Sequence, residues 1–209
     1  MQSKQDSTKM PATSFEQELW KSHQSGDDHA LSAIYSMYFD PLFNYGFRFT
    51  RDTTLIEDCI QELFLKLIRN RRNLSLPASV KAYLFKSFRS HIIDKMEQAR
   101  RRPVAEINEY ADFSLELNHE DFMISTEESD SRKQRLKAAL DQLTPRQREA
   151  IFLKYEEGLS YPEIAEMLAL TQKATYKLIG RAVQTLRTIY QLSLSSVLLK
   201  WAICFLAAI

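Results

Sequence analysis

The residues best suited to bind a ligand lie near the C-terminal end of this 209-residue chain, on a predicted helix that follows Thr171. Helical periodicity gives residues 172–186 an apolar face and a polar face. The polar face carries amide, hydroxyl and cationic groups, mostly in its first turns: Gln172, Lys173, Tyr176, Lys177 and Arg181. Such groups contact base edges in the DNA major groove or backbone phosphates. We therefore expect DNA binding here; the alternative is a solvated polar face on a bundle helix.

Two capping boxes precede this helix. Residues 144–147 (Thr-Pro-Arg-Gln) and 160–163 (Ser-Tyr-Pro-Glu) each place a Ser or Thr three residues before a Gln or Glu, with Pro in the first turn. Thr171 is placed to cap the third helix of the series. A short helix, a three-residue turn and a longer basic helix are typical of the helix-turn-helix. The sequence predicts such a domain over residues 132–190.

A second basic stretch covers residues 66–102, where 11 Lys and Arg residues face two acids. From residue 80 onward its cations alternate with aromatic residues, on a predicted helix that ends at about residue 102. Cations follow phosphates, and an aromatic side chain can accept an unstacked base. Tyr83 is the aromatic contact that we expect, whereas Phe85 and Phe88 are expected in the core. The cations expected at DNA include Lys86, Arg89 and Lys95.

The total charge of +1 hides this distribution. Residues 103–131 contain nine acids and no base, and the chain beyond them is basic again. We interpret the acidic stretch as a flexible, solvated linker between two domains. The alternative is an acidic segment that occupies a nucleic-acid channel by mimicking phosphate charge.

The remaining elements are also expected to be helical, because the chain holds only four glycines and shows amphipathic 3.6-residue periodicity. We expect a disordered N-terminus over residues 1–14 and a four-helix domain over 15–102. Its first helices are predicted from Ser14 to about Ser25 and from Asp27 or Asp28, with a new turn at Pro41. The third helix is predicted from about residue 53 to 69. The predicted fold class is therefore all-α, with two small helical domains.

No set of residues predicts an enzyme. His91 and Asp94 lie one turn apart, but no third metal ligand has suitable spacing, and no nucleophile has a base partner. We expect no metal and no cofactor. Cys59 and Cys204 are too few and too far apart for a disulfide framework, which suggests a reducing, cytoplasmic setting. The apolar tail, residues 191–209, is interrupted by Lys200 and is expected to contact a protein or lie peripherally on a membrane.

Three blocks of the chain together resemble the extracytoplasmic-function (ECF) sigma factors of the bacterial sigma-70 family. Residues 143–187 resemble region 4, Glu57 to Leu67 (EDCIQELFLKL) resembles region 2.2, and Val80 to Arg102 resembles regions 2.3 and 2.4. The resemblance covers about residues 15–190. It implies a factor that binds core RNA polymerase, directs it to promoter DNA and helps to melt the DNA, with an anti-sigma factor as a possible partner. The alternative function is a helix-turn-helix transcriptional regulator that does not bind core polymerase.

The resemblance also implies roles for individual residues. The helix before the loop at residues 70–79 would bind core polymerase through Asp58, Gln61, Glu62, Phe64 and Leu65. The loop and the following helix would capture a flipped base of the −10 element, with contacts from Tyr83, Lys86, Arg89, Ser90 and Lys95. The helix-turn-helix would bind the −35 element. Three departures from the family are Ser90 in place of Asn, Ala169 in place of Gly, and Leu178 in place of a basic residue; we expect Ala169 to cost some turn stability.

Overall fold

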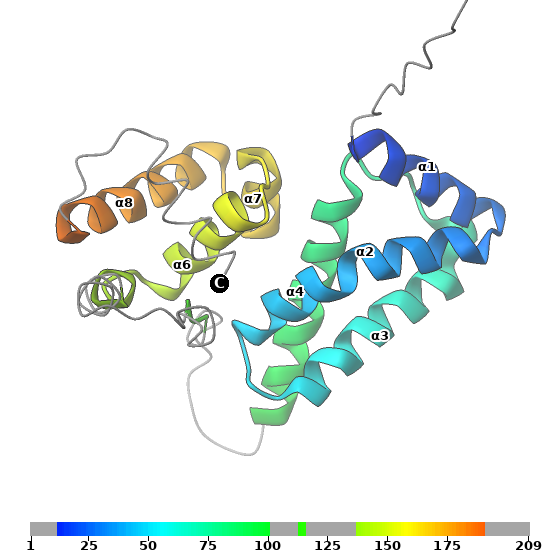
Figure 1. Ribbon diagram of the computed structural model, residues 1–209, viewed down its shortest axis with the longest axis horizontal. Helices are drawn as coiled ribbons and strands as arrows, with labels where there is room; N and C mark the ends of the chain where they lie inside the picture. The colour runs from blue at the N-terminus through cyan, green and yellow to red at the C-terminus, as the bar shows by residue number, and fades with distance from the viewer. Residues whose placement is uncertain (1–11, 101–112, 116–136, 191–209) are drawn as a thin grey trace, which may run out of the picture. The chain divides into compact units, whose positions relative to one another are not determined.

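The computed structural model describes residues 12–100, 113–115 and 137–190 (Figure 1). These residues form helices and turns and include no strand, so the all-α prediction is confirmed for them. Backbone contacts divide the chain into two compact units, with Met1–Asn44 and Thr54–Met96 in unit 1 and Tyr45–Thr53 and Glu97–Ile209 in unit 2.

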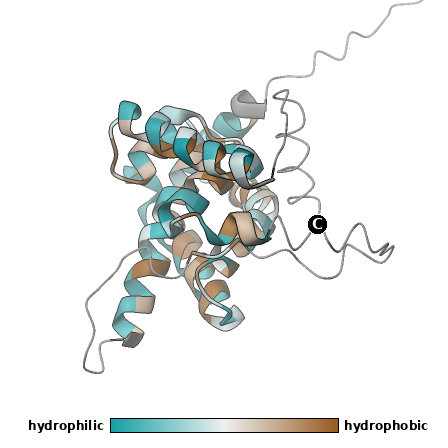
Figure 2. Cartoon of the chain, turned by 90° about the vertical axis from the view of Figure 1, so that its left-hand side faces the viewer, coloured by the Kyte–Doolittle hydropathy of each residue, from teal (hydrophilic) through white to brown (hydrophobic). Residues whose placement is uncertain are grey.

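Unit 1 is built from amphipathic helices around an apolar core. It contains α1 (Ala12–Ser25), the short 3₁₀ turn η1 (Arg71–Asn73) and most of α2 (Asp28–Phe47), α3 (Thr53–Asn70) and α4 (Val80–Arg100). The 3.6-residue periodicity explains α3, where Ile56, Ile60 and Leu67 recur on one face and are buried. Figure 2 shows teal and brown residues on the same helices, as this periodicity requires.

Three helix boundaries can be compared with the sequence predictions. α1 ends at Ser25 and is followed by Gly26, whose φ of +107° is the left-handed conformation that ends many helices. Its start at Ala12 corrects the predicted start at Ser14. α2 continues through Pro41 to Phe47, where the sequence predicted that Pro41 would begin a new turn.

Side chains of α1 hold the loop between η1 and α4. The indole Nε1–H of Trp20 donates to the carbonyl of Ser75 at 3.1 Å, and the Gln17 amide donates to the carbonyl of Ala78 at 3.1 Å. Gln24 donates to the carbonyl of Leu74. Because the donors lie three and four residues apart, they share one face of α1. The loop is thus fixed by side chains that lie about 55 residues earlier in the chain.

Unit 2 contains the helix-turn-helix. A helical turn at residues 137–141 is followed by α6 (Pro145–Ile151), the π-helical turn η3 (Phe152–Glu156), α7 (Tyr161–Met167) and α8 (Gln172–Tyr190). Both predicted capping boxes are present, with the side chains of Thr144 and Ser160 as N-caps. These caps satisfy backbone N–H groups that would otherwise lack partners, which explains why the helices begin where the sequence predicts.

Ala169 has the strained backbone that the missing glycine predicts. Its φ is +50°, and its N–H donates to the carbonyl of Glu166 at 3.4 Å, while the N–H of Leu170 donates to that of Ala165 at 2.8 Å. This pair of bonds is the Schellman arrangement, which normally places Gly at this position. Arg146 of α6 also donates to the carbonyl of Leu168 at 2.6 Å and so supports the turn.

An aromatic cluster forms another part of the core of unit 2. Phe113 is 1% exposed and packs edge-on against Phe49 and Phe152, with ring centroids 5.0 and 5.9 Å apart. The backbone N–H of Ser114 donates to the carbonyl of Arg48 at 2.8 Å. The expectation of a solvated linker is therefore wrong at Phe113, because this large apolar side chain is buried against other rings.

No helix in the described ranges is long and apolar enough to cross a membrane. The apolar tail, the N-terminal segment of residues 1–11 and most of the acidic stretch lie outside the described residues, and the predictions for them stay predictions.

Candidate nucleic-acid interface

The polar face of α8 is open to solvent. All five residues that the sequence places at DNA are exposed: Gln172, Lys173, Tyr176, Lys177 and Arg181. The opposite face buries Thr175, Ile179 and Ala182 in the core of unit 2. The Oγ1 atom of Thr171 accepts the N–H of Ala174 at 3.2 Å, so Thr171 caps the helix as predicted. The first turns of α8 therefore present amide, ammonium and phenol groups outward from a fixed helix.

One of these side chains is stacked on a second tyrosine. The rings of Tyr161, at the start of α7, and Tyr176 have centroids 3.9 Å apart and planes 23° apart. The ammonium of Lys154 lies 4.9 Å from the centroid of the Tyr161 ring and also donates to the carbonyl of Leu159 at 3.1 Å. Tyr176 is nevertheless 54% exposed, so the stack orients the ring without hiding it.

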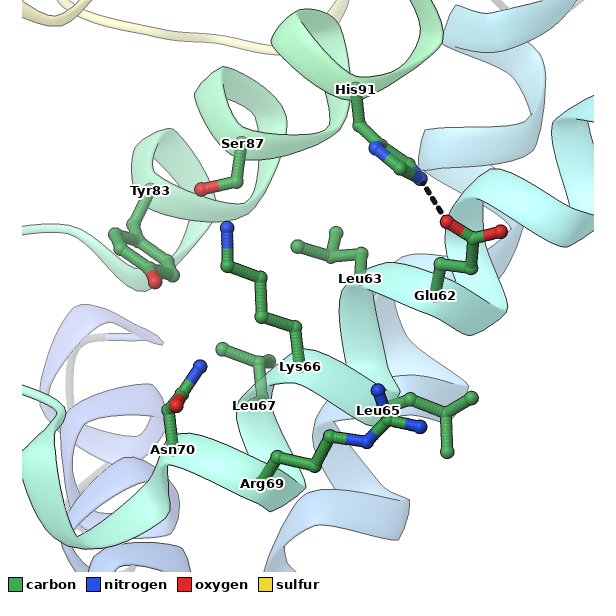
Figure 3. A pocket seen from close by; sticks show the side chains of 10 residues that line it. All are labelled: Glu62, Leu63, Leu65, Lys66, Leu67, Arg69, Asn70, Tyr83, Ser87 and His91. Carbon is green, nitrogen blue, oxygen red and sulfur yellow. Dashed lines mark ion pairs between the residues drawn. The ribbon is translucent and has the colours of Figure 1, made fainter. Parts of the chain in front are cut away.

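Unit 1 contains a cavity of about 570 Å³ between the second half of α3 and the first half of α4 (Figure 3). Polar lining residues come from both helices, and Lys66 of α3 extends toward Ser87 of α4. Tyr83 lines the cavity from α4, and Asn70 lines it where α3 ends and the loop begins. The ring of Tyr83 packs edge-on against the ring of Trp20, with the ring centroids 5.2 Å apart. A cation, an amide, a hydroxyl and an aromatic ring thus surround a space large enough for a nucleobase.

The cavity uses a different face of α4 from the one that the sequence predicts. Tyr83 lines the cavity, but Lys86 and Ser90 are exposed and are not among the lining residues. Arg89 is only 6% exposed. We therefore leave Arg89 out of the DNA-binding surface, because a buried guanidinium does not face a ligand in solvent.

Sequence reasoning did not predict base contacts at the lining residues Lys66, Ser87 and His91, whereas Asn70 begins the loop that the resemblance places at the flipped base. The lining residues of α4 could have been predicted from their spacing, because positions 83, 87 and 91 are four residues apart and therefore lie on one helix face. Lys66 and Asn70 have the same spacing on α3. Lys86 was predicted from its charge and Ser90 from the family resemblance, and these two residues are the sequence neighbours of Ser87 and His91.

The carboxylate of Glu62 joins α3 to α4. Its two oxygens lie 2.8 Å from His91 Nε2 and 2.7 Å from Lys95 Nζ. The hydrogen bond with Lys95 lowers the pKa of the Glu62 carboxyl and raises the pKa of the Lys95 ammonium. Glu62 was expected at core polymerase and Lys95 at DNA, but in this structure these two side chains bind each other.

The remaining residues expected at polymerase lie on α3. Asp58, Gln61 and Leu65 are exposed, and Leu65 is exposed over 46% of its surface. Phe64 is 5% exposed and packs edge-on against Tyr35, with centroids 5.0 Å apart, so the expectation of a surface contact is corrected for it. Ile68, which lies on the same helix, is apolar and yet 47% exposed. The outer face of α3 therefore combines acidic, amide and aliphatic groups.

Within the described ranges, no three His, Cys, Asp or Glu residues gather as they would around a metal ion. His91, considered with Asp94 as a metal pair, lies instead beside Glu62. Burial raises the pKa of the Cys59 thiol to about 11, so this buried cysteine stays protonated near neutral pH.

Comparisons with known proteins match both halves of the chain. Residues 34–102 match the model of "Sigma-70 region 2" and residues 133–186 match that of "Sigma-70, region 4". The chain is 26% identical over 171 residues to the ECF RNA polymerase sigma factor BldN of Streptomyces coelicolor, with 81% of this chain and 63% of BldN covered. It is 24% identical to the ECF RNA polymerase sigma factor SigM of Bacillus subtilis, with 77% of this chain and 94% of SigM covered.

A solved structure supports the fold. The sigma factor RpoE of Bartonella quintana, crystallised with the anti-sigma factor NepR, is 19% identical and aligns with a TM-score of 0.55 over 78% of this chain and 98% of that chain. The two matched regions occur in the order that the sequence analysis predicts. The chain therefore belongs to the sigma-70 family, in the group of ECF RNA polymerase sigma factors.

Proposed function

We propose that this chain binds core RNA polymerase as a sigma subunit, recognises promoter DNA and initiates transcription. The observation that carries this proposal is the presence of both regions, residues 34–102 and 133–186, in one chain. A helix-turn-helix alone would fit many regulators, whereas region 2 is the part that a sigma factor adds. The proposed role is that of a cytoplasmic initiation factor rather than an enzyme, with a region 2 domain over residues 15–102 and a region 4 domain over 132–190.

Region 4 would bind the −35 element through the outer face of α8. Gln172, Lys173, Tyr176 and Lys177 occupy the first turns, where side chains contact base edges, and Arg181 lies one turn further along, where we expect a phosphate contact. The exposure of all five residues supports this assignment.

Region 2 would take a flipped base of the −10 element into the cavity between α3 and α4. The Tyr83 ring offers a stacking surface, and Asn70 and Ser87 offer groups that can bond to a base edge. Lys66 supplies a positive charge for the nearby phosphate, and exposed Lys86 and Ser90 would contact the adjoining strand. The anchoring of the loop by α1 supports this role, because a base pocket needs a wall of fixed shape.

The outer face of α3 would bind core polymerase. Asp58, Gln61 and Leu65 are exposed there, and a mixed acidic and aliphatic face suits a basic partner helix. Glu62 would exchange one of its intramolecular ion pairs for a contact with the polymerase. We also propose an anti-sigma factor as a partner, as RpoE of Bartonella quintana has, to be tested by copurification from cells that overproduce the chain.

The test is reconstitution with core RNA polymerase. We expect the purified chain to be retained by immobilised core enzyme and to direct run-off transcripts from promoters identified after its overproduction. Leu65→Lys should reduce retention without changing binding to duplex DNA, because Leu65 lies in the other unit from α8. If the chain binds duplex DNA but is not retained by core polymerase, the alternative of an ordinary helix-turn-helix regulator is correct.

A further inference from the structure

The stacked tyrosines at the helix-turn-helix have a geometry that charge-based DNA binding does not explain. Lysine and arginine on α8 suffice to contact phosphates, yet among the described residues of unit 2 the most exposed large apolar residue is Tyr176. An aromatic ring that is 54% exposed loses contact with water when a complementary apolar group covers it. In the DNA major groove, the apolar group on a base edge is the C5-methyl of thymine.

The position of Tyr176 allows such a contact. Tyr176 is the fifth residue of α8, which begins at Gln172, and so lies in the part of a recognition helix that enters the groove. It is one turn from Gln172 and adjacent to exposed Lys177, so its ring lies among the side chains proposed to contact base edges.

The ring of Tyr161 is held in one position in the free protein. Tyr161 is the first residue of α7, and the capping box of Ser160 and Glu163 sets where α7 begins. Lys154 holds the Tyr161 ring from η3 while its ammonium donates to the carbonyl of Leu159. The stacked rings, 3.9 Å apart, therefore restrict the side-chain rotamers of Tyr176 in the free protein. Less side-chain entropy remains to be lost when the ring meets DNA.

We propose that Tyr176 recognises the C5-methyl group of a thymine in the −35 element, and that Tyr161 is a positioning residue which holds the Tyr176 ring for that contact. This inference rests on the proposed function of region 4. It assigns the recognition of one thymine methyl group to the ring of Tyr176, whereas the phosphate contact expected at Arg181 supplies affinity that does not depend on sequence.

The test replaces one methyl group at a time. Duplexes are selected from a random-sequence pool with holoenzyme assembled from the full chain and core polymerase, and the selected duplex is remade with deoxyuridine at each thymine in turn. Deoxyuridine lacks only the methyl group, so base pairing is unchanged. At one position we expect about a fourfold loss of affinity, the value of burying one methyl group.

The variants separate the roles of the two rings. Tyr176→Phe should keep the fourfold preference for thymine because it keeps the ring, whereas Tyr176→Ala should lose the preference. Tyr161→Leu should reduce it below twofold while affinity for the deoxyuridine duplex stays unchanged; Tyr161→Phe, which can still stack, should retain it. A variant that merely misfolds would lose affinity for both duplexes, and circular dichroism melting would identify it.

The outcomes distinguish this inference from the proposed function. Failure of the holoenzyme to bind any selected duplex would refute both. Tight binding with no thymine preference, or a full preference retained by Tyr176→Ala, would overturn the thymine contact and leave the sigma function intact. Loss of the preference in Tyr176→Phe would show that the hydroxyl rather than the ring makes the contact, and this result also overturns the inference.

Discussion

Replacing Ala169 by glycine should stabilise the helix-turn-helix. Ala169 has a φ of +50° in the turn between α7 and α8, and its side chain is exposed, so Ala169→Gly removes no packing. The left-handed conformation costs a residue with a side chain about 1–2 kcal/mol. Glycine removes this cost but gains freedom in the unfolded chain, which offsets about 0.4–1 kcal/mol. We expect a net gain in the free energy of unfolding of about 0.8 kcal/mol, which is the difference between the midpoints of these two ranges, about 1.5 and about 0.7 kcal/mol.

The control applies the same chemical change within a helix. Ala174 lies in the first turn of α8, where Ala174→Gly should cost about 1 kcal/mol because glycine is a poor helix former. Differential scanning calorimetry of the two full-length variants should show shifts of opposite sign, of about 2–4 °C if the chain unfolds as one unit and about 4–8 °C if the helix-turn-helix unfolds alone.

Hydrogen exchange gives a local test of the same reasoning. Ala169→Gly should slow exchange of the Leu170 amide, which donates to Ala165 in the Schellman bond. If Ala169→Gly instead lowers the unfolding temperature as much as Ala174→Gly does, the turn carries no backbone strain at Ala169 and the argument is refuted.

Three further predictions concern DNA affinity, pH and the base pocket. Lys173→Ala with Lys177→Ala should lower the slope of log affinity against log salt for −35 DNA by about 1.8, if each lysine meets one phosphate; an unchanged slope in fluorescence anisotropy would remove α8 from the DNA. Burial raises the pKa of the Glu156 carboxyl from 4.5 to about 7, so between these values the folded state holds a proton that the unfolded state lacks. The stability that this proton provides is therefore fully present below pH 4.5 and is lost as the pH rises through 7. The free energy of unfolding should fall by about 3 kcal/mol over this range. Urea titrations should detect the fall in the wild type and not in Glu156→Gln. Trp20→Phe removes the bond to Ser75 and should cost about 1 kcal/mol of stability; limited proteolysis should then cut the loop at residues 74–79 faster, and an equal cutting rate would show that α1 does not hold it.

The sequence by itself determined the elements of the helix-turn-helix. The caps at Thr144, Ser160 and Thr171 act on backbone groups within three residues, and the two faces of α8 follow from its own periodicity. The strain at Ala169 was expected from the family resemblance, because the family tends to have Gly at this position of the turn. These features depend on interactions between residues close together in the sequence, so a short stretch of sequence is enough to predict them.

Only the tertiary structure decided which face of each region 2 helix became a surface. A step of one residue turns a helical side chain by about 100°, so the packing of α4 against α3 determines that Ser87 lines the cavity while exposed Lys86 does not. The tertiary structure also buries Arg89, packs Phe64 against Tyr35 of α2, and pairs Glu62 with Lys95 across 33 residues of sequence. The burial of Phe113 could likewise not be predicted from the distribution of charge, because it depends on rings more than 35 positions away in the sequence. Periodicity shows that a helix has an apolar side, but only its neighbours determine which residues at the edge of that side are covered.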